Sequence, residues 1–402
     1  MPPDGAGSLL LRLNERIRRQ GPLPFSAFME ACLYDERDGF YTSGRGAGRQ
    51  RDFLTSPEVG PLFGEVVARA LDERWARLGR PDPFVVIECG AGAGTLARDV
   101  LAAGPLCGPA LRYLLVERSA ALRDAQAAVV ALELPTFVLG PTNAEDDPEG
   151  ERVGERGRGP LAAGLAELPA DPVTGVVLAN ELLDNLAFDL LQRAEPGWEE
   201  VRVGVEPAGP TRLIEPAGPT RLIEVPVPAA GHLSALADAL APDAPVGGRI
   251  PVQAEARRWL LAALGALSRG AVIAFDYADS TASLGSRPWT EWVRTYRGHG
   301  RGGRPLDDPG GQDVTCEVAV DQLAAVAVPT SVRRQAEWLA DHGLAELADR
   351  ARAEWQERAA VGDLAAVRAR SRLGEAAALA DESGLGAFTV LEWEVGSRGG
   401  AR

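Results

Sequence analysis

The feature that most constrains the fold is the segment Pro83–Leu101, which reads PFVVIECGAGAGTLARDVL. Its apolar run from Phe84 to Ile87 has the length and the β-branched content of a buried strand. Alternating glycines follow, and a helical pattern begins at Thr95. Because glycine has no Cβ, such a turn lets a ligand approach the backbone beside the N–H groups of the helix. We predict a strand, a ligand-binding glycine loop and a helix, with a purely structural turn as the alternative.

The spacing within this loop favours one kind of ligand. Glu88 ends the strand and starts the pattern E-x-G-x-G-x-G, whose glycines are Gly90, Gly92 and Gly94. The third glycine of the dinucleotide fingerprint would fall at Thr95, so the spacing argues against a dinucleotide. The pattern is typical of the nucleoside-binding loop of S-adenosylmethionine (SAM) methyltransferases, and Glu88 is a candidate cofactor-binding residue.

An acidic residue stands where a nucleoside-binding fold needs one. Residues 111–116 (LRYLLV) read as the next strand, which is followed directly by Glu117. In nucleotide-binding α/β folds, an acid about 20 residues beyond the loop binds the ribose hydroxyls. A carboxylate suits this role because it can accept two hydrogen bonds from a vicinal diol. Glu117 is therefore a candidate ribose ligand, with an exposed strand-end glutamate as the alternative.

Strand and helix patterns alternate from Pro83 onward, which predicts an α/β fold with a Rossmann-like, mostly parallel sheet and helices on both faces. We expect strands near residues 84–88, 111–116, 135–139, 175–179 and 271–276, and a closing strand at 387–395. Residues 187–205 predict antiparallel strands around a Pro-Gly turn. Residues 1–80 look helical, with loops between the helices.

Charge and cysteine usage limit the classes of partner. The net charge of −15 argues against a general nucleic-acid binder. The sequence lacks an apolar run near the ~18 residues of a transmembrane helix, so we expect no membrane insertion. The four cysteines have no paired spacing, which predicts neither a metal site nor a disulfide framework and favours the cytoplasm. The oligomeric state stays open, and a dimer is compatible with the sequence.

A second motif, VVLANELLDNL at residues 176–186, carries candidate catalytic side chains. Its apolar start predicts a strand, beyond whose carboxyl end Asn180 and Glu181 would emerge, with Asp184 close behind. Ligands bind beyond the carboxyl ends of strands in doubly wound sheets. An amide can orient an acceptor nitrogen, and a carboxylate can hold a guanidinium bidentately. The alternative is that these residues only begin a helix.

Two further segments hold candidate residues. Asp276 and Tyr277 follow the predicted strand in AVIAFDYADS. His299 lies in the arginine-rich stretch TYRGHGRGGR and could act as a general base near neutral pH. The arginines around it could bind phosphate or acidic groups. A solvated loop is the alternative for the whole stretch.

Several motifs together resemble the MidA-like family, whose mitochondrial members are complex I assembly factors that methylate an arginine. They occur in order as DFLTSPEVGPLFGE, ECGAGAGTLARDVL, VVLANELLDNLAFD, AFDYADS and TYRGHGRGGRPLDDPGGQDVT. The resemblance implies a class I SAM methyltransferase with an N-terminal helical cap and an insertion between late core strands. We therefore expect a cap over residues 1–80, the first part of the core over 81–205, an insertion over 206–268 and the rest of the core over 269–402.

The resemblance also implies roles for individual residues. The cofactor would be closed over by Thr55, Ser56, Pro57 and Glu58. The glycine loop would bind its methionine part and Glu117 its ribose. Asn180, Glu181 and Asp184 would border the transfer site. Family positions without an assigned role are matched by Asp276, Tyr277, His299, Asp313 and Thr315. No metal is implied.

The resulting prediction is an enzyme that uses SAM to methylate a protein, with an arginine nitrogen as the acceptor. The chain departs from the family pattern at Ala187 and across residues 315–320, where TCEVAV replaces polar and aromatic positions. These departures concern the acceptor more than the cofactor. A small-molecule O- or N-methyltransferase is one alternative. A non-catalytic SAM-binding assembly or scaffold protein is another.

Overall fold

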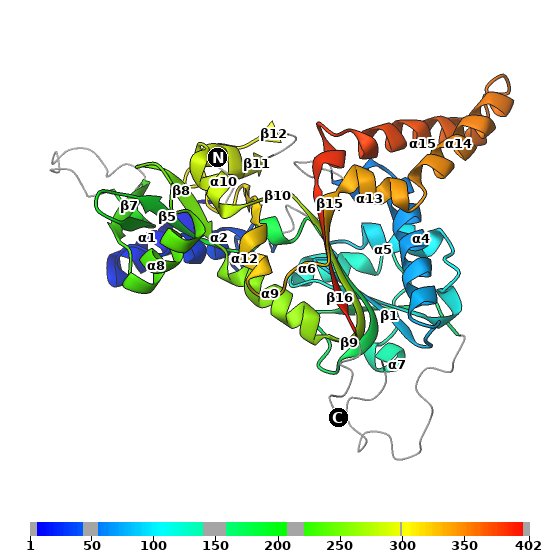
Figure 1. Cartoon of the computed structure of the whole chain (residues 1–402), viewed down its shortest axis with the longest axis horizontal. Coiled ribbons are helices and arrows are strands. Elements are labelled where there is room, and N and C mark those ends of the chain that lie inside the picture. Colours follow the sequence, from blue (N-terminus) through cyan, green and yellow to red (C-terminus); the bar gives the residue numbers. More distant parts are fainter. Residues whose placement is uncertain (1–5, 43–54, 140–157, 207–220, 298–299, 397–402) are drawn as a thin grey trace, which may run out of the picture. The chain divides into compact units, whose positions relative to one another are not determined.

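The computed structural model describes residues 6–42, 55–139, 158–206, 221–297 and 300–396 (Figure 1). The chain divides into two compact units, each built from three segments. The parallel-sheet unit comprises Leu54–Leu182, Leu261–Tyr277 and Ala327–Arg402. The antiparallel unit comprises Met1–Phe53, Leu183–Leu260 and Ala278–Val326. In this division the N-terminal helices group with later strands, and the domain boundaries expected at residues 80, 205 and 268 stay a prediction.

The parallel-sheet unit is built around seven strands in the order β15-β16-β9-β4-β1-β2-β3. Strands β1, β2, β3, β4 and β9 are mutually parallel, whereas β16 is antiparallel to both β9 and β15. The predicted α/β class with a mostly parallel sheet is thereby confirmed. The bounds are β1 (Phe84–Cys89), β2 (Leu111–Val116), β3 (Leu161–Leu165), β4 (Val173–Asn180), β9 (Leu267–Asp276), β15 (Ser331–Arg334) and β16 (Thr389–Val395).

The central strands form where the sequence has continuous apolar runs. Every residue of β1 and of β2 is buried, as expected for parallel strands that are covered on both faces. Their register pairs Phe84 with Leu111 and Cys89 with Val116. The strands expected near 84–88, 111–116, 175–179, 271–276 and 387–395 are all confirmed.

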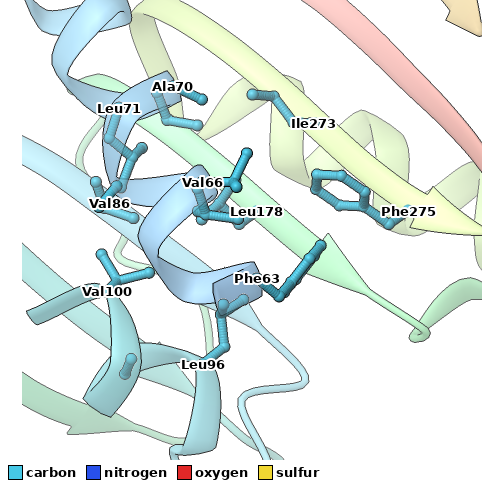
Figure 2. Close-up of a cluster of buried hydrophobic side chains, with 14 of the residues drawn as sticks. Phe63, Val66, Ala70, Leu71, Val86, Leu96, Val100, Leu178, Ile273 and Phe275 are labelled. Carbon is cyan, nitrogen blue, oxygen red and sulfur yellow. The ribbon is translucent and has the colours of Figure 1, made fainter. Parts of the chain in front are cut away.

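Helices cover this sheet and bury its apolar side chains. Figure 2 shows residues of α4 and α5 facing side chains of β1, β4 and β9: Phe63, Val66, Ala70, Leu71, Leu96 and Val100 meet Val86, Leu178, Ile273 and Phe275. The helices of this unit are α3 (Ser56–Val59), α4 (Leu62–Arg77), α5 (Thr95–Ala102), η1 (Gly108–Ala110), α6 (Ala120–Gln126), α7 (Pro135–Leu139), α13 (Gln335–Asp341), α14 (Leu344–Arg358), α15 (Leu364–Ala380) and η3 (Leu385–Ala387).

The prediction of a strand at residues 135–139 is wrong, because this segment forms helix α7. Its β-branched and aromatic residues resemble a strand, but only Val138 is buried, and Phe137 is 47% exposed. A proline at the first helical position also suits a helix, since its fixed φ is pre-organised there. The third parallel strand is β3 instead, which pairs with β2 from Leu161 opposite Arg112.

The antiparallel unit contains a four-stranded sheet in the order β7-β6-β5-β8, a three-stranded sheet in the order β12-β11-β13, and the pair β10-β14. Its strands are β5 (Asp189–Arg193), β6 (Trp198–Val205), β7 (Leu222–Pro228), β8 (Arg249–Val252), β10 (Ala278–Asp279), β11 (Val293–Arg297), β12 (Gly300–Arg301), β13 (Asp313–Cys316) and β14 (Val318–Ala319). Its helices are α1 (Ala6–Gln20), α2 (Phe25–Tyr34), η2 (Leu183–Asn185), α8 (Gly231–Leu240), α10 (Thr281–Ser286), α11 (Trp289–Trp292) and α12 (Val320–Ala324), and α9 (Ala254–Gly265) contains a unit boundary.

The N-terminal helices share their core with β5 and β6. Phe25 and Phe28 of α2 are fully buried, and the ring centroid of Phe25 lies 5.1 Å from that of Phe188. The antiparallel pair predicted within residues 187–205 is confirmed, and its turn is closed by Ala194, whose N–H donates to the carbonyl of Gly197. Among the helices of the described ranges, none is both long and apolar enough to cross a bilayer.

Candidate functional site

The glycine loop joins β1 to α5 in a conformation that favours glycine. Gly90, Gly92 and Gly94 all have positive φ angles, of 67°, 54° and 86°. L-residues that carry a side chain rarely adopt positive φ angles. A Cβ at position 90 would also lie 2.9 Å from the Leu182 side chain. The loop therefore keeps its backbone uncovered, with the N-terminus of α5 beginning directly behind it.

Glu117 is tied to this loop by hydrogen bonds. Its Oε2 accepts from the Gly92 N–H at 3.0 Å, and its Oε1 accepts from the Ser119 N–H at 2.8 Å. Gln126 holds the loop from the other side, because its Nε2 donates to the Gly92 carbonyl at 2.9 Å. Each carboxylate oxygen has capacity for more than one hydrogen bond, so Glu117 can also accept from a vicinal diol placed beside the loop.

Glu88 has a partner inside the sheet. The Tyr113 hydroxyl donates to its carboxylate at 2.8 Å, and Glu88 is 4% exposed. Burial, followed by the charge and the hydrogen bond of Glu88, raises the pKa of Tyr113 well above its ordinary value. The phenol therefore stays protonated as the donor. This contact orients Glu88 under the loop, and its binding of a cofactor stays a prediction.

Asn180 is the last residue of β4 and Glu181 follows it, at the strand end that the sequence predicted, and β4 lies next to β1 in the sheet. Glu181 has a φ of 50°, which is an uncommon conformation for a residue other than glycine, asparagine or aspartate. Its N–H donates to the Phe275 carbonyl at 2.9 Å, which holds the turn against β9. The Asn180 Nδ2 donates to Glu181 Oε1 at 3.1 Å. In the described part of the chain, the buried Asn180 Oδ1 has no hydrogen-bond partner.

The four residues 55–58 form a turn that contacts Glu181. Thr55 caps α3 in a capping box with Glu58, and Pro57 lies in the first turn. The Ser56 N–H donates to Glu181 Oε1 at 3.2 Å. Ser56 itself is fully buried. The structure thus brings the 55–58 segment and Glu181 together, although 125 residues separate Ser56 from Glu181 in the chain.

Gln335, which the sequence did not single out, holds this turn in place. It is fully buried at the start of α13, and its Nε2 donates to Ser56 Oγ and to the Leu385 carbonyl, both at 2.9 Å. Its N–H donates to the Phe388 carbonyl at 2.7 Å. Gln335 belongs to no recognisable local motif. Only the structure shows its link to the 55–58 turn.

Asp276 ends β9 in the same unit. It is 1% exposed, and its Oδ1 accepts from the Tyr277 N–H at 2.9 Å. The Tyr277 ring packs against Phe388, with ring centroids 3.9 Å apart. These contacts fix the end of β9 beside the Glu181 turn, and a role for Asp276 or Tyr277 in chemistry stays a prediction.

The other predicted site residues belong to the antiparallel unit or lie outside the described residues. Asp184 is 7% exposed within η2, and its place in a common site with Glu181 stays a prediction. Asn185 donates through Nδ2 to Asp313 Oδ1 at 3.0 Å, and the Tyr41 hydroxyl lies 3.0 Å from Asp313 Oδ2. Thr315 is 8% exposed in β13. His299 falls outside the described residues, and the residues that are described contain no cluster suited to a metal ion.

Sequence comparison identifies relatives of this chain. A mitochondrial protein of Drosophila melanogaster, named "Protein arginine methyltransferase NDUFAF7 homolog", is 33% identical over 211 residues, which are 50% of this chain and 46% of the relative. Its counterparts in rat and human are 29% and 27% identical, over 51% and 50% of this chain and 47% and 45% of their own length. The chain thus matches less than half of the length of these curated relatives.

Structural comparison supports the fold over nearly the whole chain. A crystal structure from Burkholderia thailandensis, with S-adenosyl-homocysteine bound, superposes with a TM-score of 0.74 at 24% identity. The match covers 98% of this chain and 94% of that one. A native crystal structure from the same organism matches equally well.

A family model described as "Putative S-adenosyl-L-methionine-dependent methyltransferase" matches residues 66–336. The matched range contains the glycine loop, Glu117 and the Asn180–Glu181 turn, which also carried the predicted MidA-like resemblance. This resemblance is confirmed, and the chain belongs to the family of S-adenosyl-L-methionine-dependent methyltransferases.

Proposed function

We propose that this protein transfers a methyl group from SAM to an arginine side chain of a protein. The observation that carries the proposal is the Glu181 turn, where a carboxylate held by two N–H donors lies beside the buried, unpartnered Asn180 Oδ1. The family membership supports the cofactor, and the printed names of the curated relatives support the acceptor.

The residues of the loop fit the nucleoside of SAM. The glycines have positive φ angles, and a Cβ at Gly90 or Gly94 would press on Leu182 or Leu115 and disturb the loop. Glu117 offers both carboxylate oxygens near Gly92 and would hold the ribose hydroxyls. When bound, SAM supplies an electrophilic methyl group on a positively charged sulfur. The binding residues therefore have to fix its position rather than activate it.

The Glu181 turn would position the acceptor. A carboxylate binds a guanidinium through two parallel hydrogen bonds and so fixes the plane of the arginine nitrogens. Asn180 Oδ1 is an acceptor without a partner among the described residues, so it can take an N–H of the same group. The Ser56 N–H and Asn180 Nδ2 both point at Glu181 Oε1, which keeps the carboxylate oriented before the acceptor arrives.

Substitution Glu181→Gln tests this assignment. We expect SAM affinity in calorimetry to stay within about threefold, because Glu117 and the loop are untouched. Transfer of tritium-labelled methyl groups to protein in a cell extract should fall by roughly 100-fold, because the guanidinium loses its charged partner. Amino-acid analysis of wild-type reactions should find the label in methylarginine.

Other outcomes separate the alternatives. Label in a small-molecule fraction would replace the protein acceptor with a metabolite. Label on a residue other than arginine would keep the methyltransferase and reject the acceptor. Failure of the wild-type protein to bind SAM would reject the proposal at its first step, and titration with NAD is the matched negative control.

We infer a reducing compartment for this protein and propose the cytoplasm. Cys32, Cys89, Cys107 and Cys316 are all buried free thiols. Burial raises the pKa of Cys32, which keeps its thiol protonated and unreactive. The named relatives are mitochondrial proteins, so fractionation of the source cells with an antibody decides the location.

A further inference from the structure

The antiparallel unit contains a pocket of about 690 Å³ that the proposed transfer of a methyl group leaves without a role. It is lined by residues 221–224, 289–290, 293–295 and 301–306. These come from the start of β7, from α11 and β11, and from β12 with the loop that follows it. The last group includes part of the arginine-rich stretch that the sequence offered as a binder of acidic groups.

Four arginines line the pocket, and they differ in their partners. Arg294 is paired with Glu317 at 2.7 Å, and Arg304 is paired with Asp307 at 3.0 Å. Arg221 and Arg301 are exposed, and neither has a hydrogen-bonded carboxylate among the residues that the structure describes, although the charge of Arg221 contributes to lowering the pKa of Asp307. In a chain of net charge −15, two such guanidinium groups on one pocket are a local reversal of charge.

The walls of the pocket are fixed by other contacts. The Arg249 guanidinium donates to both Glu224 carboxylate oxygens, at 3.0 and 2.6 Å, and lies 4.5 Å from the Trp289 ring centroid. Thr295 Oγ1 donates to the Gly303 carbonyl at 2.6 Å. Gln312 Nε2 donates to the Arg304 carbonyl at 2.8 Å. These contacts order the side chains of the pocket wall before a ligand binds. Less conformational entropy is then lost on binding, which favours affinity.

Apolar side chains make up the rest of the lining. Leu222 and Val293 are each 4% exposed, and Ile223, Trp289 and Leu306 are partly buried. A free phosphate or sulfate would leave this apolar wall in water. A ligand that matches both parts carries carboxylates beside an apolar side chain. β7 is also an edge strand of its sheet in the described structure, and such an edge can receive an extended chain.

We propose that this pocket binds an acidic, leucine-containing segment of the protein that the enzyme methylates. The carboxylates would pair with Arg221 and Arg301, and the apolar side chain would pack on Leu222, Val293 and Trp289. The inference rests on the proposed function, because it takes the acceptor to be a protein. It adds a second point of recognition, which selects the acceptor by its acidic segment.

The test is fluorescence anisotropy with a fluorescein-labelled peptide rich in glutamate and leucine. Its comparison probe is the same peptide with every glutamate replaced by glutamine. We expect the acidic peptide to bind the wild-type protein and the glutamine peptide to bind far more weakly. The double variant Arg221→Gln with Arg301→Gln should weaken binding of the acidic peptide by about tenfold, since each exposed ion pair is worth a few-fold in affinity.

The matched control removes two exposed arginines elsewhere, as Arg350→Gln with Arg368→Gln on α14 and α15. This control removes the same two positive charges and should bind the acidic peptide like the wild type. An equal loss of peptide affinity in both double variants would overturn the proposal for this pocket, because binding would then depend only on the overall charge of the protein. Absence of acidic-peptide binding to the wild type would also overturn it, as would full competition by inorganic phosphate or preferred binding of a labelled RNA.

SAM titration of the same variants keeps the two proposals distinguishable. We expect both double variants to bind SAM like the wild type, because none of the four arginines lies in the glycine loop. Peptide binding that depends on Arg221 and Arg301 supports the pocket even where no methyl transfer is found. SAM binding without any peptide binding would leave the proposed reaction standing and remove the pocket.

Discussion

At the scale of single residues, the site depends on backbone positions as much as on side chains. Glu181 adopts a left-handed conformation that costs an ordinary residue roughly 1 kcal/mol or more, and its neighbours hold it there. Its N–H is bound by the Phe275 carbonyl, and its carboxylate by the Ser56 N–H. Uncommon backbone geometry that the surroundings enforce is frequent at functional sites.

Glu117→Ala is a prediction at this scale. The change leaves the N–H groups of Gly92 and Ser119 without their buried acceptor. Loss of such a partner costs about 1–3 kcal/mol, so calorimetry should show SAM affinity weakened by roughly 5- to 150-fold. Glu167→Ala, an exposed glutamate just beyond β3, is the control and should bind SAM normally. Equal affinity in both variants would contradict the role of Glu117.

Site residues could be predicted from the sequence where they follow a strand or belong to a motif of fixed spacing. The topology of a parallel sheet brings such residues to one edge of the sheet. Glu117 and Glu181 belong to this class. Gln335 could not be predicted, because its contact with Ser56 joins positions 279 residues apart through a side chain with no motif. His299 lies outside the described ranges, and its role as a general base stays a prediction.

At the scale of elements, the short helix α3 is the clearest case of a structure that depends on distant partners. A helix of four residues is not stable in isolation, and its capping box provides hydrogen bonds only to backbone N–H groups at its N-terminus. Gln335 ties it to α13 and η3. The 55–58 turn thus owes its position at the sheet edge to a residue that comes late in the chain.

Gln335→Leu should release this turn. In this variant the Ser56 Oγ and the Leu385 carbonyl lose the donor that Gln335 provides. This loss should lower the free energy of unfolding by about 1–3 kcal/mol. A double-mutant cycle with Ser56→Ala, measured by chemical denaturation, isolates the contact. If the two changes are coupled, the double variant loses less than the sum of the single variants. Strict additivity would show that the hydrogen bond contributes nothing.

Elements were predictable where an apolar run was continuous and misleading where it was not. The strands β1, β2, β4 and β9 carry such runs, and all four were expected. The sequence LAAGL of β3 has weak strand propensity and was not recognised, whereas TFVL in α7 has strong strand propensity and is helical. The segment LAAGL becomes a strand because it pairs with β2, which is a long-range interaction. Local strand propensity contains no information about that pairing.

At the scale of the whole molecule, neither unit is a continuous piece of chain. The chain passes from one unit to the other at five points. The family resemblance predicted a cap and an insertion as separate domains, whereas by contacts the N-terminal helices group with residues 183–260. Sequence patterns reveal where elements begin and end, but they do not reveal which distant elements pack together.

Within the parallel-sheet unit, one buried ion-pair network joins α4, β15 and β16 and makes stability depend on pH. Glu392 is 3% exposed and binds Arg74 at 2.7 Å and Arg333 at 2.9 Å. Burial by itself raises the pKa of Glu392, but the charges of Arg74 and Arg333 outweigh it and lower the pKa below the ordinary value. The folded state then binds its proton less readily than the unfolded state does.

Glu392→Gln should therefore destabilise the protein in a pH-dependent way. The stabilisation by a carboxylate with a lowered pKa is present above the unfolded pKa and is lost as the pH falls through the folded pKa. At neutral pH we expect the free energy of unfolding to drop by about 1.5–3 kcal/mol, since buried Arg74 loses one of its two carboxylate partners and keeps only Glu394. The difference from wild type should shrink below about pH 4.5. A difference that is constant with pH would contradict this origin.

The grouping of α1 and α2 with β5 and β6 has a consequence for biosynthesis. These two helices are synthesised before the strands that they pack against, because Phe25, Phe28 and their apolar neighbours are buried against Phe188 and Val201. Roughly 150 residues of chain separate the helices from those strands, which at typical rates of translation takes about 8–30 s. For that interval the nascent chain presents an aromatic helix with no partner. We therefore expect the apolar face of α2 to be a binding site for chaperones while the chain is being synthesised.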